Sequence, residues 1–175
     1  MAQAVRLQGF DIVLAIRLIR PASILAALAE ELGVVPSQVH ASLKRLAIAG
    51  LIRPGTRHSN RNSLREFIEH GIRYAFPVHV GRPARGIPTS HSAPLLAGHI
   101  DSADAFVWPA AHAPGSVQGL SIAPLYAKAP MLAEKSPETY QAVALLDAFR
   151  VGNARERSIA SQVLAELIHG APAIA

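Results

Sequence analysis

The sequence predicts a mainly α-helical fold, with helices at both ends of the chain and a loop-rich segment between them. Half of the 175 residues are apolar and 17% are charged, a balance that favours a packed core. Apolar residues recur at helical spacing over residues 7 to 76 and again over residues 137 to 168. Nine of the 13 prolines lie between Pro77 and Pro137, and prolines at that density prevent long helices.

Three helices are predicted within the first 50 residues. The first covers residues 7 to 19, where apolar residues recur near helical spacing. Ser23 is the candidate N-cap of the second helix, and Gly33 ends it at the position that favours glycine. After a short link, Ser37 is the expected cap of a third helix, which Gly50 ends. Its expected buried residues are Val39, Leu43, Leu46 and Ala47.

A short strand, a loop and a fourth helix are predicted next. Residues 51 to 52 are apolar and have strand character, and residues 53 to 62 form a loop because they contain Pro-Gly, serine and asparagine. Ser63 and Glu66 have the spacing of a capping box ahead of an apolar run. We therefore expect the fourth helix to begin at Ser63 and to end near Phe76.

The proline-rich segment is predicted to consist mainly of ordered loop. Residues 106 to 109 and 117 to 122 are compatible with the two short strands of a β-hairpin. A flexible linker is the alternative for residues 81 to 98. Trp108 and Tyr126 are expected in the core, the alternative being the lining of a pocket for an effector.

Two helices are predicted in the C-terminal part, over residues 137 to 149 after the cap Ser136 and over residues 154 to 168. The charged residues between them, from Asp147 to Arg157, are interpreted as an intrachain salt-bridge corner rather than a partner-binding edge. The sequence thus divides into residues 1 to 76, residues 77 to 136 and residues 137 to 175.

Composition excludes several classes of protein. The chain has no cysteine, which excludes disulfide scaffolds, thiol catalysis and cysteine-ligated metals. No run approaches the roughly 20 apolar residues of a membrane span, and the N-terminus lacks the pattern of a secretory signal. We therefore expect a cytoplasmic protein with no membrane contact.

Positive charge is concentrated in the N-terminal half. The formal net charge is +5, and residues 36 to 65 contain six basic residues and no acidic one. A localised basic stretch indicates a polyanionic partner such as nucleic acid.

The same stretch has the pattern of a helix-turn-helix motif, in which a bracing helix and a tight turn present a polar second helix. The outward residues of that second helix are expected to be Ser37, Gln38, His40, Ala41, Lys44 and Arg45. Gln38 can bind an adenine edge, and Arg45 or Lys44 can reach guanine or phosphate. Ser37 lies where a helix N-terminus can meet phosphate.

These residues resemble the winged helix-turn-helix of MarR-type bacterial transcriptional regulators. The matching segments are Leu28 to Gly33, Pro36 to His40, Leu43 to Leu46 and Gly50 to Ile52. The resemblance covers roughly residues 8 to 60. It implies DNA binding, transcription regulation, and a homodimer formed through the first helix and the last two helices.

Two features depart from that family. Ala41 stands where such regulators often have a long polar side chain, so base readout is expected to depend on Gln38 and His40, or to be weak. The β-hairpin wing is missing or cut short. Phosphate contacts in its place are expected from Arg53, Arg57, His58 and Arg61.

Other chemistry is weakly supported. His91, His99 and His112 lack the spacing of a helical zinc pair. Hydroxyls flank His91, but no Gly-x-Ser-x-Gly turn is present. We therefore expect no metal, no cofactor and no enzymatic activity. An enzyme that uses these histidines is the third interpretation.

The sequence as a whole predicts a sequence-specific DNA-binding regulator that acts as a homodimeric repressor on double-stranded DNA. The alternative is an antitoxin-like interaction protein. Its C-terminal half would bind a partner protein, and its N-terminal half would regulate its own operon. A helical hairpin used only for protein contact is the plainer interpretation of the N-terminal motif, and the six uncompensated positive charges argue against it.

Overall fold

The computed structural model describes residues 4–21 and 24–170. Its α-helices are α1 (Gly9–Arg17), α2 (Leu25–Leu32), α3 (Pro36–Ile48), α4 (Arg61–His70), α5 (Ile72–Ala75), α6 (Pro94–Ala97), α7 (Leu132–Lys135), α8 (Pro137–Val151) and α9 (Ala154–His169). Its strands are β1 (Pro83–Thr89), β2 (Phe106–Pro109) and β3 (Val117–Ser121). The fold is mixed, with many helices and one small sheet, so the mainly α prediction is confirmed only in part.

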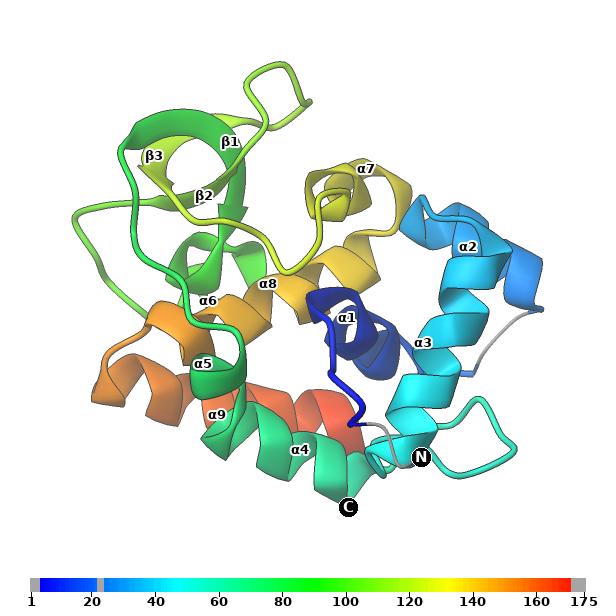
Figure 1. Cartoon of the computed structure of the whole chain (residues 1–175). Helices are drawn as coiled ribbons and strands as arrows, with labels where there is room; N and C mark the ends of the chain where they lie inside the picture. The colour runs from blue at the N-terminus through cyan, green and yellow to red at the C-terminus, as the bar shows by residue number, and fades with distance from the viewer. Residues whose placement is uncertain (1–3, 22–23, 171–175) are drawn as a thin grey trace.

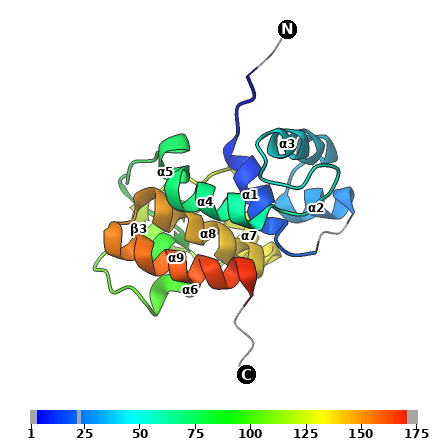
Figure 2. The same cartoon turned by 90° about the horizontal axis from the view of Figure 1, so that it is seen from below.

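Helix α8 runs through the middle of the molecule (Figures 1 and 2). Ten of its 15 residues are buried, on all sides of the helix, as expected of a helix surrounded by other elements. The elements that contact it include α1, α4, α9 and β1. Buried apolar residues from Phe10 to Ile168 belong to one hydrophobic core. The three parts that the sequence suggests therefore share a single core.

Most predicted helices are present, with shifted ends. The expected cap Ser23 lies outside the described residues. Helix α3 begins at Pro36 with Val35 as N-cap, so the prediction that Ser37 caps it is wrong, and proline takes the first-turn position that suits it. Helix α4 begins at Arg61, and the side chain of Asn60 accepts a hydrogen bond from the Ser63 amide. The predicted capping box at Ser63 is therefore wrong.

The strands close into a small barrel (Figure 1). Strand β1 is antiparallel to both others, and its Gly86 is opposite Pro109 in β2 and Val117 in β3. Strands β2 and β3 are parallel to each other. The two strands predicted for this segment exist, but the predicted hairpin between them is wrong. The flexible-linker alternative is also wrong, because β1 lies within residues 81 to 98.

Asp147 attaches this barrel to α8. Its carboxylate is buried and accepts hydrogen bonds from Thr89 Oγ1 at 2.7 Å and from Trp108 Nε1 at 2.6 Å. Arg150 donates to the other carboxylate oxygen at 2.6 Å. The interpretation of this charged region as an intrachain salt-bridge corner is thereby confirmed for Asp147 and Arg150. Trp108 is fully buried, as expected of a core residue.

Glu31 joins α2 to the start of α8. Its carboxylate accepts hydrogen bonds from Arg17 Nε at 2.8 Å and from the hydroxyls of Ser136 and Thr139 at 2.7 Å each. Burial raises the pKa of Glu31, but these hydrogen bonds outweigh burial, and the resulting pKa lies below its ordinary value. The N-terminal helices are thus joined to the C-terminal half by hydrogen bonds to a charged carboxylate as well as by packing.

No helix within the described residues is both long and apolar enough to span a membrane.

We expect Gly86→Ala to destabilise the protein by about 1–3 kcal/mol, because a Cβ at this position would overlap the carbonyl oxygen of Trp108 on the paired strand. Gly98→Ala is the matched control, since a Cβ there meets nothing within 4 Å. Urea denaturation of the two variants measures the difference. Equal denaturation midpoints for the two variants would contradict the close approach of β1 to β2 at Gly86.

We expect the free energy of unfolding to fall as the pH drops below about 4.5, the ordinary pKa of the Glu31 carboxyl. The pKa of Glu31 is lower in the folded state than in the unfolded state. The stability contributed by its ionised carboxylate is therefore fully present above the unfolded-state pKa and is lost as the pH falls through the folded-state pKa. Glu31→Gln should be less stable at neutral pH and should show a shallower acid dependence. The exposed Glu134→Gln on α7 is the control. An unchanged acid dependence in Glu31→Gln would contradict the role assigned to this network.

Candidate nucleic-acid interface

The turn between α2 and α3 is tightly defined. Gly33 ends α2 with a φ of 67°, a left-handed conformation that glycine adopts without strain. The amide of Val34 donates to the carbonyl oxygen of Ala29 at 2.9 Å. Met131 packs against this turn, and its Sδ would lie 2.6 Å from a Cβ placed on Gly33. The predicted end of the second helix at Gly33 is confirmed.

A buried ion pair sets the rotation of α3 about its own axis. Asp11 on α1 is fully buried, and it accepts hydrogen bonds from Arg45 Nε at 2.8 Å and from an Arg45 terminal nitrogen at 2.7 Å. Ser42 Oγ donates to the same carboxylate at 2.6 Å. The hydrogen bonds from Arg45 to Asp11 raise the pKa of the guanidinium, so Arg45 stays charged.

This ion pair decides which side of α3 faces solvent. The exposed predicted residues are Ser37, Gln38, His40, Ala41 and Lys44. Arg45 is different, because its side chain is only 20% exposed and its guanidinium faces Asp11. We correct its assigned role accordingly: Arg45 positions α3 and does not lie on the outer face.

The loop after α3 forms a very short hairpin. Ile52 and Ser59 make a single antiparallel bridge, and the Arg53 amide donates to the carbonyl oxygen of His58 at 2.9 Å. Ser59 is buried and donates through its hydroxyl to the carbonyl oxygen of Ala15 on α1. The loop is therefore anchored at its base, while Arg53, Arg57 and His58 are exposed.

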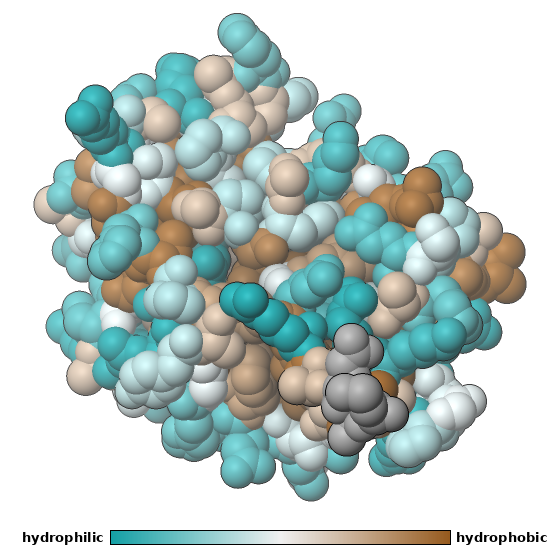
Figure 3. Space-filling view, viewed as in Figure 1, coloured by the Kyte–Doolittle hydropathy of each residue, from teal (hydrophilic) through white to brown (hydrophobic). Residues whose placement is uncertain are grey.

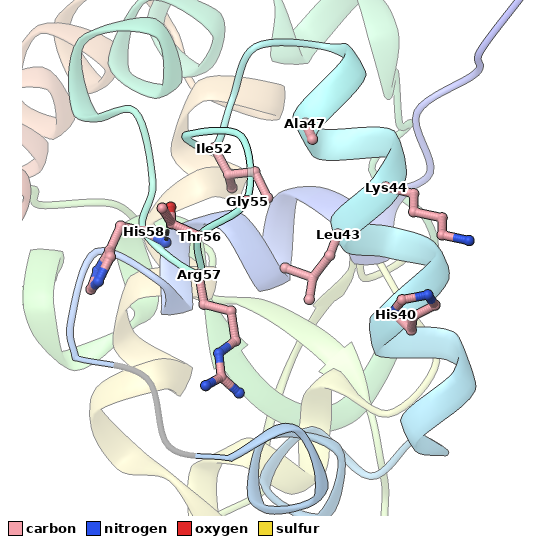
Figure 4. A pocket seen from close by; sticks show the side chains of 9 residues that line it. All are labelled: His40, Leu43, Lys44, Ala47, Ile52, Gly55, Thr56, Arg57 and His58. Atoms are coloured by element: carbon pink, nitrogen blue, oxygen red, sulfur yellow. Dashed lines mark hydrogen bonds between the residues drawn. The ribbon is translucent and has the colours of Figure 1, made fainter.

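A groove of about 550 Å³ separates α3 from this loop (Figure 4). One wall is α3, with His40, Leu43 and Lys44, and the other is the loop, with Thr56, Arg57 and His58. The amine of Lys44 points away from the loop (Figure 4). The remaining lining residues are Ala47, Ile52 and Gly55. No carboxylate lines the groove, so its two permanent charges, on Lys44 and Arg57, are both positive.

The other predicted contact residues do not line this groove: Ser37, Gln38, Ala41, Arg45, Arg53 and Arg61. Arg53 is exposed at the base of the loop. Arg61, the first residue of α4, donates to the carbonyl oxygen of Ile19 at 3.0 Å. That bond holds Arg61 toward the end of α1.

Asp11 and Ser42 are the residues that sequence reasoning missed. One signal was present: Asp11 is the single acidic residue of an apolar helix, and a buried charge requires a partner. The partner could not be read from the sequence, because Arg45 is 34 positions away.

The histidines of the proline-rich segment do not assemble into a site. His91 is buried, whereas His99 and His112 are exposed. Over residues 4–21 and 24–170, no group of three or more His, Cys, Asp or Glu side chains is arranged to hold a metal ion.

Two of the three helices expected at the dimer surface are largely buried. Residues Phe10 to Ile16 of α1 are all buried, and α8 lies in the core. Of the three helices that the resemblance suggested, only α9 presents a substantial exposed face.

We expect Arg45→Met to lower the free energy of unfolding by about 3 kcal/mol, because it leaves the buried Asp11 carboxylate without its cation. Lys44→Met is the matched control, since this neighbouring lysine is exposed and its removal should cost less than about 0.5 kcal/mol. Denaturant unfolding measures both variants. Similar losses in the two would contradict the positioning role of Arg45.

Comparison of the chain with protein-family models, with curated proteins and with solved structures finds no match. The likeness of residues 8 to 60 to MarR-type regulators therefore stays an interpretation of the sequence.

Proposed function

We propose that this chain is a DNA-binding transcriptional regulator that places α3 in the major groove of double-stranded DNA. The observation that carries the proposal is the groove between α3 and the loop over residues 53 to 58, which is lined by Lys44 and Arg57 and by no carboxylate. A duplex bound through its major groove has a phosphate backbone at the edge of that groove. With α3 inserted, this phosphate backbone would lie in the cationic groove between α3 and the loop.

The two walls of the groove would have different roles. Lys44 on α3 and Arg57 on the loop would contact phosphates, which adds affinity but carries no sequence information. The exposed residues at the start of α3, Ser37, Gln38 and Ala41, would face base edges. The loop would thus serve as a reduced wing.

The anchoring of both walls supports this division. The Asp11–Arg45 pair holds α3, and the hydroxyl of Ser59 holds the loop, both against α1. Rigid placement of the two walls lets several contacts form without ordering each part separately. The alternative of a helical hairpin used only for protein contact does not account for this arrangement of cations.

We further propose a homodimeric repressor in the cytoplasm, because one recognition helix covers only a few base pairs and paired half-sites increase specificity. The exposed face of α9 is the surface through which two copies would meet, since α1 and α8 are buried.

The test is fluorescence anisotropy with the DNA upstream of the chain's own gene and with a scrambled duplex, at two salt concentrations. Binding should prefer the native duplex and weaken with salt. Arg57→Ala should weaken binding to both duplexes alike. It should also reduce by about 0.9 the slope of the logarithm of the binding constant against the logarithm of the salt concentration. Arg82→Ala, which removes an exposed arginine just before β1, is the charge-matched control and should change neither.

Absence of binding to either duplex at low salt would refute the proposal. Equal losses from Arg57→Ala and Arg82→Ala would show that net charge, and not this groove, attracts the DNA.

A further inference from the structure

We propose that α3 reads A·T base pairs from the major groove, with Gln38 binding adenine and with Val35 and Ala41 contacting thymine methyl groups. This inference rests on the proposed function, because it names the base pairs that the exposed face of α3 prefers. Three features of the described residues carry it.

The first feature is that no arginine is free to read guanine from α3. Bidentate binding of arginine to guanine is the commonest specific base contact in the major groove. Arg45 is the only arginine of α3, and both its Nε and a terminal nitrogen donate to Asp11. Lys44, the other cation of the helix, is exposed, and its side chain points away from the loop (Figure 4). Residues 36 to 43, at the start of α3, thus contain no arginine or lysine that could read guanine.

The second feature is exposed apolar surface at the same end of the helix. Val35, the N-cap of α3, is 60% exposed, and Ala41 is exposed further along the same helix. The thymine C5-methyl is the one apolar group that a base pair presents in the major groove. Ile24, the N-cap of the neighbouring α2, is 69% exposed, and hydrophobic surface is visible over the region of α2 (Figure 3).

The third feature is an amide placed between these apolar residues. Gln38 is exposed, and its side chain makes no hydrogen bond among the described residues. Ala41 follows Gln38 by three residues, so the two are neighbours on the surface of α3, and Val35 is the N-cap that precedes the first turn. A glutamine amide donates to adenine N7 and accepts from adenine N6, so it pairs with adenine in a bidentate manner.

The residue set is therefore complementary to an A·T pair on both strands. The amide suits adenine, and the flanking apolar groups suit the thymine methyl of the same or the next pair. A G·C pair offers neither group: guanine presents two acceptors, and cytosine presents a donor and no methyl group.

Binding to four duplexes of alternating sequence, each about 20 base pairs long or two helical turns, tests the inference at low salt. They are (dA-dT), (dA-dU), (dG-dC) and (dI-dC). Uracil lacks the thymine methyl. The I·C pair has the minor-groove edge of A·T but the major-groove edge of G·C, so it separates the two grooves.

The (dA-dT) duplex should bind at least about tenfold more tightly than both (dG-dC) and (dI-dC). Removal of the methyl groups in (dA-dU) should weaken binding by about fourfold for each thymine methyl that the protein would otherwise bury. Gln38→Ala should abolish the preference for (dA-dT) over (dI-dC). Val35→Ala should reduce the difference between (dA-dT) and (dA-dU).

The matched controls are Gln118→Ala and Val117→Ala, both on β3, which make the same chemical changes at exposed positions outside the motif. Both should bind as the unmodified protein does, because they lie outside the proposed DNA-binding surface. All four substituted side chains are exposed, so each variant should fold.

Equal affinity for all four duplexes would overturn the A·T inference and leave the proposed function standing, since DNA binding itself would be observed. Equal affinity for (dA-dT) and (dI-dC), both above (dG-dC), would place the readout in the minor groove and also overturn it. Failure to bind any of the four, or the upstream DNA, would overturn both proposals.

Discussion

One buried carboxylate on α1 fixes the orientation of the helix on which the proposed function depends. Asp11 binds both Arg45 and Ser42 of α3, and it is fully withdrawn from water. A buried charge of this kind is costly unless it is paired, so α3 has one favourable rotation. That rotation turns Gln38 and Ala41 to solvent and removes Arg45 from the surface. The same contact therefore positions the helix and limits which bases it can read.

The C-terminal half acts as the support for this arrangement. Helix α8 fills the centre of the core, the barrel is joined to it through Asp147, and α2 is joined to its start through Glu31. Met131 packs on the Gly33 turn itself. The N-terminal motif is thus embedded in the rest of the fold, and any change that moves α7 or α8 bears directly on the turn between α2 and α3.

Local features were predictable from the sequence, and long-range pairings were not. The helices, the end of α2 at Gly33 and the exposed side of α3 follow from apolar spacing and a left-handed glycine, which act within a few residues. Strand β1 was missed because Pro83 and Pro88 read as loop residues, although proline is tolerated at the first position of a strand and at an edge. The parallel pairing of β2 with β3 and the Asp11–Arg45 pair join distant segments, and no local pattern specifies them. For the candidate site, this meant that its exposed residues were predicted while the role of Arg45 was not.

NMR titration of the isotope-labelled chain with a short duplex would show whether α3 and the loop beside it form the DNA-binding surface. Amide shifts should concentrate in residues 35 to 44 and 53 to 58, with little change over the exposed face of α9. Shifts confined to the C-terminal half, or none at low salt, would contradict this placement of the surface.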